Sequence, residues 1–145
     1  MVIYIDMDNV LCDYKAAYQE AIKQDPVNKY PQSQYGFFVN LKPIKDAIES
    51  AIELSKNNEV YILTAPSVRN PFSYIEKRVW VENWLGMKFV ERLIISPNKG
   101  LFHGDILIDD HLNGSGQELF SGRLIQFGCS QYPTWAEVLC EIITN

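Results

Sequence analysis

The stretch Val2-Ile3-Tyr4-Ile5-Asp6-Met7-Asp8-Asn9-Val10 (VIYIDMDNV) decides the fold predicted for this chain. Its first four residues are apolar, with β-branched side chains and a tyrosine, which is typical of a short buried strand in a parallel sheet. Asp6 and Asp8 follow, and their two-residue offset places both side chains on the same side of an extended segment. Open α/β sheets bind ligands at the carboxyl ends of their strands, so the two carboxylates mark a predicted site. The alternative is a turn with two solvated aspartates.

Three later segments repeat this pattern of an apolar strand followed by polar residues. The predicted strand and the polar residues after it are, in order, residues 60–63 with Thr64, residues 93–95 with Lys99, and residues 106–108 with Asp109 and Asp110. A further strand is expected near residues 124–127. Because the carboxyl ends of parallel strands meet at one edge of a sheet, these polar side chains are expected to lie close together.

The Asp6 and Asp8 carboxylates need a partner if they are buried. Burying two acids without a counter-charge would be costly, and like charges so close repel each other. A divalent cation such as Mg²⁺ would relieve both effects, and a carboxylate near this ion can act as a nucleophile toward phosphorus. The pair therefore indicates metal-dependent chemistry on a phosphate.

Helical patterns alternate with the predicted strands. The predicted helices begin at Tyr14, after Pro43, at Pro71 and after the capping box Thr134-Trp135-Ala136-Glu137. The side chains of the last helix that should face the core are Trp135, Val138, Leu139, Ile142 and Ile143. Strands that alternate with helices imply an α/β fold, with a Rossmann-like parallel sheet that has helices on both faces. One domain over residues 1–145 is expected.

The composition limits the classes of function. The 145 residues are 47% hydrophobic, enough for one substantial core. Thirteen Lys and Arg against eighteen Asp and Glu give a net charge of −5, which argues against binding of a nucleic-acid polymer through its phosphates. No apolar run approaches the roughly 20 residues that span a bilayer, and Asp6 and Asp8 interrupt the first apolar run, so neither a membrane segment nor a leader is expected. We expect a cytoplasmic protein with reduced thiols at Cys12, Cys129 and Cys140.

The ordered motifs DxD, Thr, Lys and DD resemble the haloacid dehalogenase (HAD) superfamily of aspartate-nucleophile phosphatases, over residues 2–110. Several blocks are similar, more narrowly, to the 5'(3')-deoxyribonucleotidases. These blocks are DMDNVLCD (residues 6–13), FFVNLKP (37–43), TAP (64–66), YIEKRVWVENWLG (74–86) and LIDD (107–110). The resemblance implies a HAD-like fold with a small cap inserted after the first strand, at about residues 12–42.

The resemblance also implies catalytic and metal-binding roles. Asp6 would be the nucleophile that forms a phospho-aspartate, and Asp8 would be the general acid and base. Mg²⁺ would be held by a carboxylate oxygen of Asp6, the backbone carbonyl of Asp8 and a carboxylate of the Asp109-Asp110 pair. Asp110 is favoured as the direct ligand with Asp109 behind it, and the reverse assignment stays open.

Three residues are expected to bind the phosphate. By the same resemblance, Thr64 would supply its hydroxyl, backbone N–H groups near Ala65 would assist, and Lys99 would stabilise the bound phosphate and the transition state. Taken singly, a threonine at a strand end could equally be a helix cap, and a lysine after Pro-Asn could be solvated. Their order in the chain favours the functional interpretation.

Two aromatic residues match family positions that sandwich the nucleobase, Tyr14 and Phe38. The alternative is that both rings belong to the hydrophobic core. Two departures from the family pattern bear on the site: Asn9 replaces the usual glycine after the second aspartate, and Val68 replaces a lysine that reaches the substrate, with Arg69 next to it as a substitute. The base preference cannot be carried across that second change.

The helical block that contains Glu76, Lys77 and Trp80 is interpreted as structural. The expected function is a Mg²⁺-dependent phosphatase of (deoxy)ribonucleoside 5'-monophosphates, and also of 3'-monophosphates. Its alternatives are a HAD phosphatase of another small phosphate, such as a sugar phosphate, and a binding protein without turnover. Base preference, sugar discrimination and oligomeric state, including a homodimer that covers the site, are left open.

Overall fold

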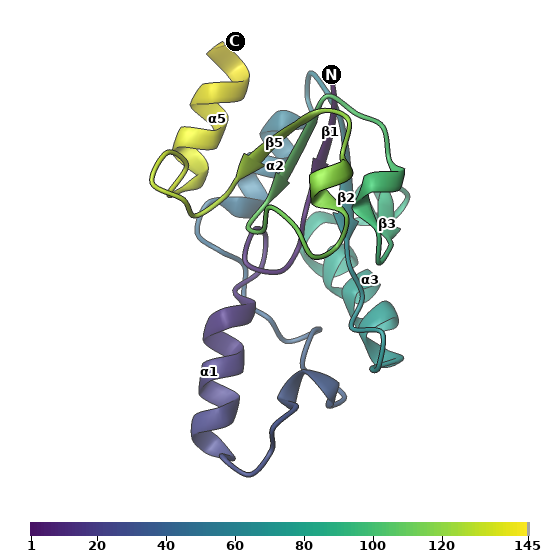
Figure 1. Ribbon diagram of the computed structural model, residues 1–145, viewed down its shortest axis with the longest axis vertical. Helices are drawn as coiled ribbons and strands as arrows, with labels where there is room; N and C mark the ends of the chain where they lie inside the picture. Colours follow the sequence, from purple (N-terminus) through teal and green to yellow (C-terminus); the bar gives the residue numbers. More distant parts are fainter. Residues whose placement is uncertain (145) are drawn as a thin grey trace.

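Five parallel strands form one sheet in the order β3-β2-β1-β4-β5 (Figure 1). The computed structural model describes residues 1–144. The strands are β1 (Val2–Ile5), β2 (Glu59–Thr64), β3 (Leu93–Ile95), β4 (Ile106–Asp109) and β5 (Arg123–Gln126). Ile5 in the central strand is in register with Ile62 of β2 and Ile108 of β4. The residues that follow these strands therefore lie at one edge of the sheet, as the sequence predicted.

Helices and short 3-10 turns connect the strands. The α-helices are α1 (Tyr14–Gln24), α2 (Ala47–Leu54), α3 (Phe72–Leu85), α4 (Met87–Val90) and α5 (Trp135–Thr144), and the 3-10 helices are η1 (Pro31–Ser33), η2 (Lys99–Leu101) and η3 (Gln117–Leu119). From β1 the chain moves to β2 and then to β3, in one direction across the sheet. It then crosses back to β4 on the other side of β1 and continues to β5 in the opposite direction. Right-handed crossovers consequently place these two groups of connections on opposite faces of the sheet.

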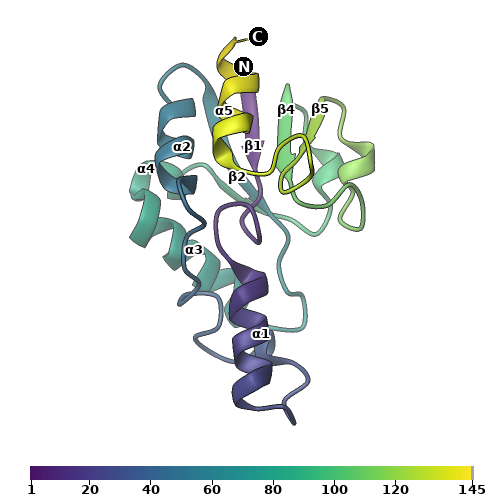
Figure 2. The ribbon, with the colours of Figure 1, turned by 90° about the vertical axis from the view of Figure 1, so that its left-hand side faces the viewer.

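The two faces of the sheet have different coverings (Figure 2). On one face, Ile3 and Ile5 join the large hydrophobic core, in which Trp80 of α3 and Trp135 of α5 are almost fully buried. On the other face, Tyr4 packs with Leu63 and Leu107 and with the aromatic rings that follow η2 and η3, Phe102 and Phe120. The fold is therefore the expected α/β sheet, with α2, α3 and α5 on one face and the short 3-10 helices η2 and η3 on the other.

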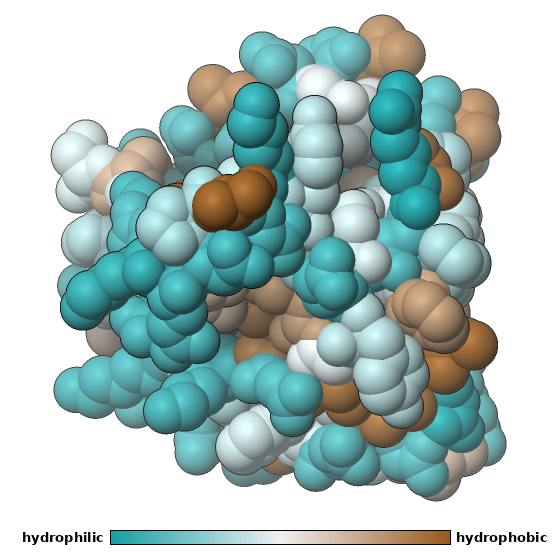
Figure 3. Space-filling model, turned by 90° about the horizontal axis from the view of Figure 1, so that it is seen from below, coloured by the Kyte–Doolittle hydropathy of each residue, from teal (hydrophilic) through white to brown (hydrophobic). Residues whose placement is uncertain are grey.

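The segment between β1 and α2 extends beyond the carboxyl edge of the sheet. It contains α1 and η1, and both ribbon views show α1 projecting away from the chain termini (Figures 1 and 2). Asp13 caps α1, since its Oδ1 accepts a hydrogen bond from Ala16 N at 3.0 Å. Viewed from this end, hydrophilic side chains cover most of the surface, with hydrophobic ones scattered between them (Figure 3).

Two details of the predicted helices were wrong. The helix after Pro43 begins at Ala47, because Asp46 has φ +63° and so cannot continue a right-handed helix from Ile44. Ile143 of α5 is 62% exposed and does not face the core. The capping box of α5 is confirmed, since Glu137 Oε2 accepts from Thr134 N at 3.1 Å.

Candidate active site

Asp6 lies at the centre of the site, immediately after β1. Its backbone N–H donates to Ile108 O at 2.9 Å, which continues the pairing of β1 with β4 by one residue. Its carboxylate Oδ1 is 2.8 Å from the ammonium of Lys99, and this ammonium is 2.5 Å from Asp109 Oδ2. Burial alone would lower the pKa of Lys99, but the Asp6 and Asp109 carboxylates outweigh it and raise that pKa. Lys99 is thus a buried cation held between two carboxylates.

Asp109 is saturated with donors and has no exposed surface. Besides Lys99, the backbone N–H of His111 donates to it at 2.9 Å and Gln117 Nε2 lies 3.3 Å from both of its carboxylate oxygens. Burial, together with the charge of Asp6, raises the pKa of Asp109. Its oxygens are largely committed to protein donors, which suits a structural acid behind the pocket.

Asp110 instead lines the pocket and has weaker partners. Asn9 Nδ2 donates to its Oδ2 at 3.2 Å, and the exposed His111 ring nitrogen is 3.3 Å from the same oxygen. Burial, and then the charge of Asp6, raises the pKa of Asp110 to about 6. Asn9 has φ +60°, the left-handed region in which glycine is easiest and asparagine is among the least disfavoured residues.

Asp6, Asp109 and Asp110 form a cluster that suits a cation. Each offers one carboxylate oxygen, and these oxygens lie within 4.8 Å of one another. When all three are ionised, they face the single ammonium of Lys99, so two negative charges remain uncompensated at a buried site. A divalent cation with oxygen ligands would balance that charge, and the three carboxylates fit one.

Asp8 belongs to a separate ion pair. Lys77 of α3 is fully buried, and its ammonium donates to Asp8 Oδ2 at 2.9 Å and to the Thr64 hydroxyl at 2.8 Å. The same ammonium lies 5.1 Å from the centroid of the Phe38 ring. Lys77, interpreted from the sequence as structural, thus contacts Asp8 at the pocket with its charged group.

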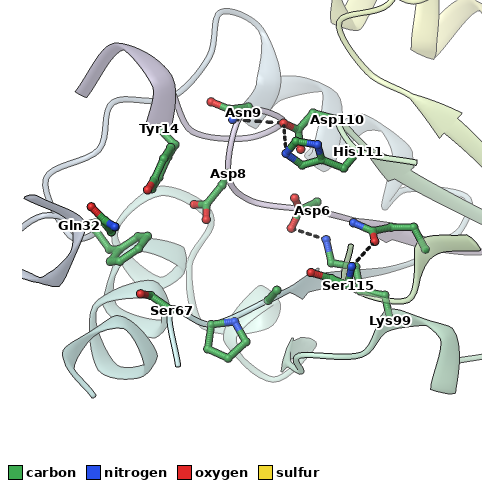
Figure 4. Close-up of a pocket in the computed structure, with 14 residues that line it drawn as sticks. Asp6, Asp8, Asn9, Tyr14, Gln32, Ser67, Lys99, Asp110, His111 and Ser115 are labelled. Carbon is green, nitrogen blue, oxygen red and sulfur yellow. Dashed lines mark hydrogen bonds and ion pairs between the residues drawn. The ribbon is translucent and has the colours of Figure 1, made fainter. Parts of the chain in front are cut away.

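A pocket of about 330 Å³ opens beside these acids (Figure 4). Its lining residues are Asp6, Asp8, Asn9, Tyr14, Gln32, Phe38, Ala65, Pro66, Ser67, Lys99, Asp110, His111, Ser115 and Gln117. Thr64 and Asp109 are adjacent to this lining but are themselves buried, with 0% exposure each. The structure thus brings the sequence-predicted residues together, with Thr64 and Asp109 behind the pocket wall. Arg69, considered as a substitute for the missing lysine, lines a different hollow.

The other end of the pocket is aromatic. Tyr14 is half-buried and stacks on Tyr18 with ring centroids 6.0 Å apart. Burial, and then the charge of Asp8, raises the pKa of Tyr14 to about 12. Phe38 also lines the pocket but is only 1% exposed and belongs to the core. Tyr14 therefore offers more surface to a ligand than Phe38 does.

Cys12 is the cysteine nearest the pocket, and it is poorly suited to a nucleophilic role. Its thiol is buried and donates to Met7 O at 3.3 Å, and burial raises the pKa of Cys12 well above its usual range. Cys129 and Cys140 are also free.

Among residues 1–144, no helix has the length and apolar character needed to cross a membrane.

The chain is similar to several known proteins. A family model described as "5' nucleotidase, deoxy (Pyrimidine), cytosolic type C protein" matches residues 18–138. A protein of Vibrio phage KVP40 named "Putative 5'(3')-deoxyribonucleotidase" is 38% identical over 147 residues, covering 95% of this chain and 82% of its own length. The human 5'(3')-deoxyribonucleotidase, cytosolic type, is 29% identical over 168 residues, covering 94% of this chain and 78% of its own. Among solved structures, the chain is similar to a haloacid dehalogenase-like hydrolase of Burkholderia xenovorans LB400, itself described as putative. The match covers 85% of this chain and 78% of the hydrolase chain, with a TM-score of 0.46 and 16% sequence identity.

Proposed function

The chain belongs to the 5' nucleotidase, deoxy (pyrimidine), cytosolic type C family, which makes it a phosphoric monoester hydrolase. We propose that it hydrolyses (deoxy)ribonucleoside 5'-monophosphates, and also 3'-monophosphates. We further propose that the reaction passes through a phospho-aspartate on Asp6. One observation supports this most directly. A single pocket has the carboxylates and Lys99 at one end and Tyr14 at the other (Figure 4). Its volume of about 330 Å³ lies at the lower end of ligand pockets, which span about 300–1,000 Å³.

Asp6 would attack the phosphorus in line with the leaving oxygen. Lys99 holds Oδ1 of Asp6 at 2.8 Å, so the carboxylate is oriented and its second oxygen remains for attack. The new bond joins this oxygen to phosphorus while the ester P–O bond breaks. The charge of Lys99 then stabilises the phosphoryl oxygens in the transition state.

Asp8 would move the protons. In the first step the protonated carboxyl of Asp8 gives its proton to the leaving alkoxide of the nucleoside, and in the second step the resulting carboxylate accepts a proton from the water that attacks the aspartyl phosphate. Phosphate then leaves and the Asp6 carboxylate is restored. Lys77 holds Oδ2 of Asp8, and Oδ1 has only the Cys12 thiol as a weak partner at 3.6 Å, so Oδ1 is the oxygen proposed for proton transfer.

The buried wall residues would support these two acids. Because the Thr64 hydroxyl accepts from Lys77, Thr64 would fix that ammonium next to Asp8 as well as lie near the phosphate. Ala65 lines the pocket, so backbone N–H groups near it are the proposed phosphate donors on this side. These positions follow from the aligned ends of β1 and β2.

Mg²⁺ is the proposed cofactor. Asp6, Asp110 and the backbone carbonyl of Asp8 would hold it, with Asp109 behind them securing Lys99. When bound, the ion supplies positive charge that reduces the repulsion between the anionic nucleophile and the anionic phosphate. We assign the direct contact to Asp110 because it lines the pocket, whereas Asp109 is buried among protein donors.

Residues 12–42 are proposed to act as a small cap within one domain. They bring Tyr14, Gln32 and Phe38 to the pocket from outside the sheet.

A cytoplasmic location is proposed because the three cysteines are free.

A substrate panel tests the proposal. The protein would be assayed with Mg²⁺ against 5'- and 3'-nucleoside monophosphates, deoxyribose 5-phosphate and other sugar phosphates, with phosphate release as the readout. Preference for the nucleotides, lost in Asp6→Asn, is the expected result. Equal or better turnover of the sugar phosphates would favour the alternative assignment.

A further inference from the structure

The base end of the pocket contains a polar group that the proposed mechanism does not use, the side-chain amide of Gln32. Gln32 lies in η1 and lines the pocket at the same end as Tyr14, away from Asp6, Lys99 and Asp110 (Figure 4). Its Oε1 is buried without a hydrogen-bond partner. In the described part of the chain, the other buried side-chain oxygens without a partner are the two of Glu76, which does not line the pocket.

The backbone of Gln32 is held in place although its amide oxygen is not. Its carbonyl accepts a hydrogen bond from Asn70 Nδ2 at 2.7 Å, and Asn70 is 1% exposed. Asn70 Oδ1 accepts in turn from Phe72 N at 3.0 Å, at the start of α3. This contact ties η1 to the loop after β2, so the Gln32 side chain starts from a fixed point above the pocket.

A buried acceptor without a donor is unfavourable unless a ligand supplies the donor. Resting on the proposed function, we infer that Gln32 is a specificity-determining residue whose amide hydrogen-bonds the edge of the substrate's nucleobase. Oε1 would accept from an N–H of the base, and Nε2 would donate to an adjacent acceptor on the same edge. A flat base that contacts Tyr14 would present such an edge toward Gln32, whereas a phosphate, which offers acceptors at neutral pH, would not satisfy Oε1.

The test compares a nucleotide with a sugar phosphate that lacks the base. Wild type, Gln32→Met and the control Gln34→Met would be assayed for kcat/KM on the best nucleoside 5'-monophosphate and on deoxyribose 5-phosphate. Gln34 is exposed and does not line this pocket, so it matches the change in side chain without touching the site. Losing the hydrogen bonds to the base should lower kcat/KM for the nucleotide by about 10-fold in Gln32→Met and leave deoxyribose 5-phosphate within about twofold. The control should match wild type on both.

A second measurement separates recognition from structure. Because Oε1 has no partner in the free protein, Gln32→Met should keep or raise the melting temperature. Equal losses on both substrates, an unchanged nucleotide rate or a clearly lower melting temperature would each overturn the inference. The wild-type assay judges the proposed function separately, since failure to prefer the nucleotide over deoxyribose 5-phosphate would refute that function whatever the variants do.

Discussion

The ion pair between Lys77 and Asp8 gives the sharpest test of the site, through the variant Lys77→Met. The change keeps a long unbranched side chain but removes the charge that contacts Asp8 Oδ2 at 2.9 Å and Thr64 Oγ1 at 2.8 Å. Lys77 is fully buried, whereas the Asp8 side chain is 27% exposed and can be partly hydrated after the change. Breaking a fully buried pair costs about 3–5 kcal/mol, so partial hydration places this variant near 2–3 kcal/mol.

The size of the effect sets the assay. For a chain of this length, about 2–3 kcal/mol corresponds to a decrease in melting temperature of roughly 5–10 °C. Urea unfolding of Lys77→Met, Asp8→Asn and the double variant would give the free energy of unfolding for each. If the pair is real, the double variant should be less destabilised than the sum of the single variants by about 2 kcal/mol, since neither charge is then left alone. Lys88→Met, at an exposed lysine of α4, is the matched control and should stay within about 0.5 kcal/mol of wild type.

Catalysis gives an independent readout of the same pair. Lys77→Met should lower kcat by at least about tenfold, because Asp8 loses the contact that orients its proton-transferring carboxylate. Additive stability effects within about 0.5 kcal/mol, combined with an unchanged kcat, would refute the inferred interaction.

Three further predictions concern the acids and the rings. Asp6→Asn should abolish turnover without unfolding the protein, and activity within about tenfold of wild type would identify another nucleophile. EDTA should stop activity and Mg²⁺ should restore it, whereas full activity in EDTA would show that the reaction does not need the metal. Titration calorimetry should show weaker Mg²⁺ binding in Asp110→Ala than in Asp109→Ala. The reverse ranking would exchange the roles of these two aspartates. Tyr14→Ala should weaken the binding of nucleotides by about 1–3 kcal/mol, as expected for loss of stacking, and leave the binding of a sugar phosphate unchanged. Phe38→Ala should lower the free energy of unfolding by about 3–5 kcal/mol and reduce activity on all substrates together. A loss of activity on nucleotides alone in Phe38→Ala would contradict the placement of this ring in the core.

The residues that the sequence could place are those next to strand ends. Asp6, Lys99 and Asp110 each follow a short apolar run, and a parallel sheet brings the carboxyl ends of such runs to one edge whatever the rest of the fold does. Local order in the sequence is therefore enough to predict their proximity. What it does not specify is depth, so Thr64, whose hydroxyl was expected to bind the phosphate, lies behind the pocket wall.

The contact of Lys77 with Asp8 was not predicted, because α3 does not follow the usual pattern of burial throughout. Its polar residues Glu76 and Lys77 are buried, while Ile75 is 64% exposed and Trp84 is 47% exposed. Apolar periodicity, the main signal for a helix face, therefore does not identify the buried side of this helix, although Trp80 and Val81 are buried. Gln32 lies in a segment of prolines and amides that has no periodicity, so no pattern could orient its side chain toward the pocket.

The charges of the site fall into two groups, and this division explains why two lysines are needed. Lys77 balances Asp8 one to one, whereas Lys99 pairs with Asp6 and Asp109 in a cluster that also contains Asp110. Only the second group is left with excess negative charge, so a cation bound there would act on the nucleophile and the phosphate. Asp8 would keep Lys77 as its own partner, so its proton transfers to the leaving group and from water would not involve the cations that keep the nucleophile ionised. If one lysine were shared by all four acids, proton transfer by Asp8 would be coupled to the ionisation of the nucleophile. Lys77, buried in α3, serves Asp8 separately and so keeps these two processes apart.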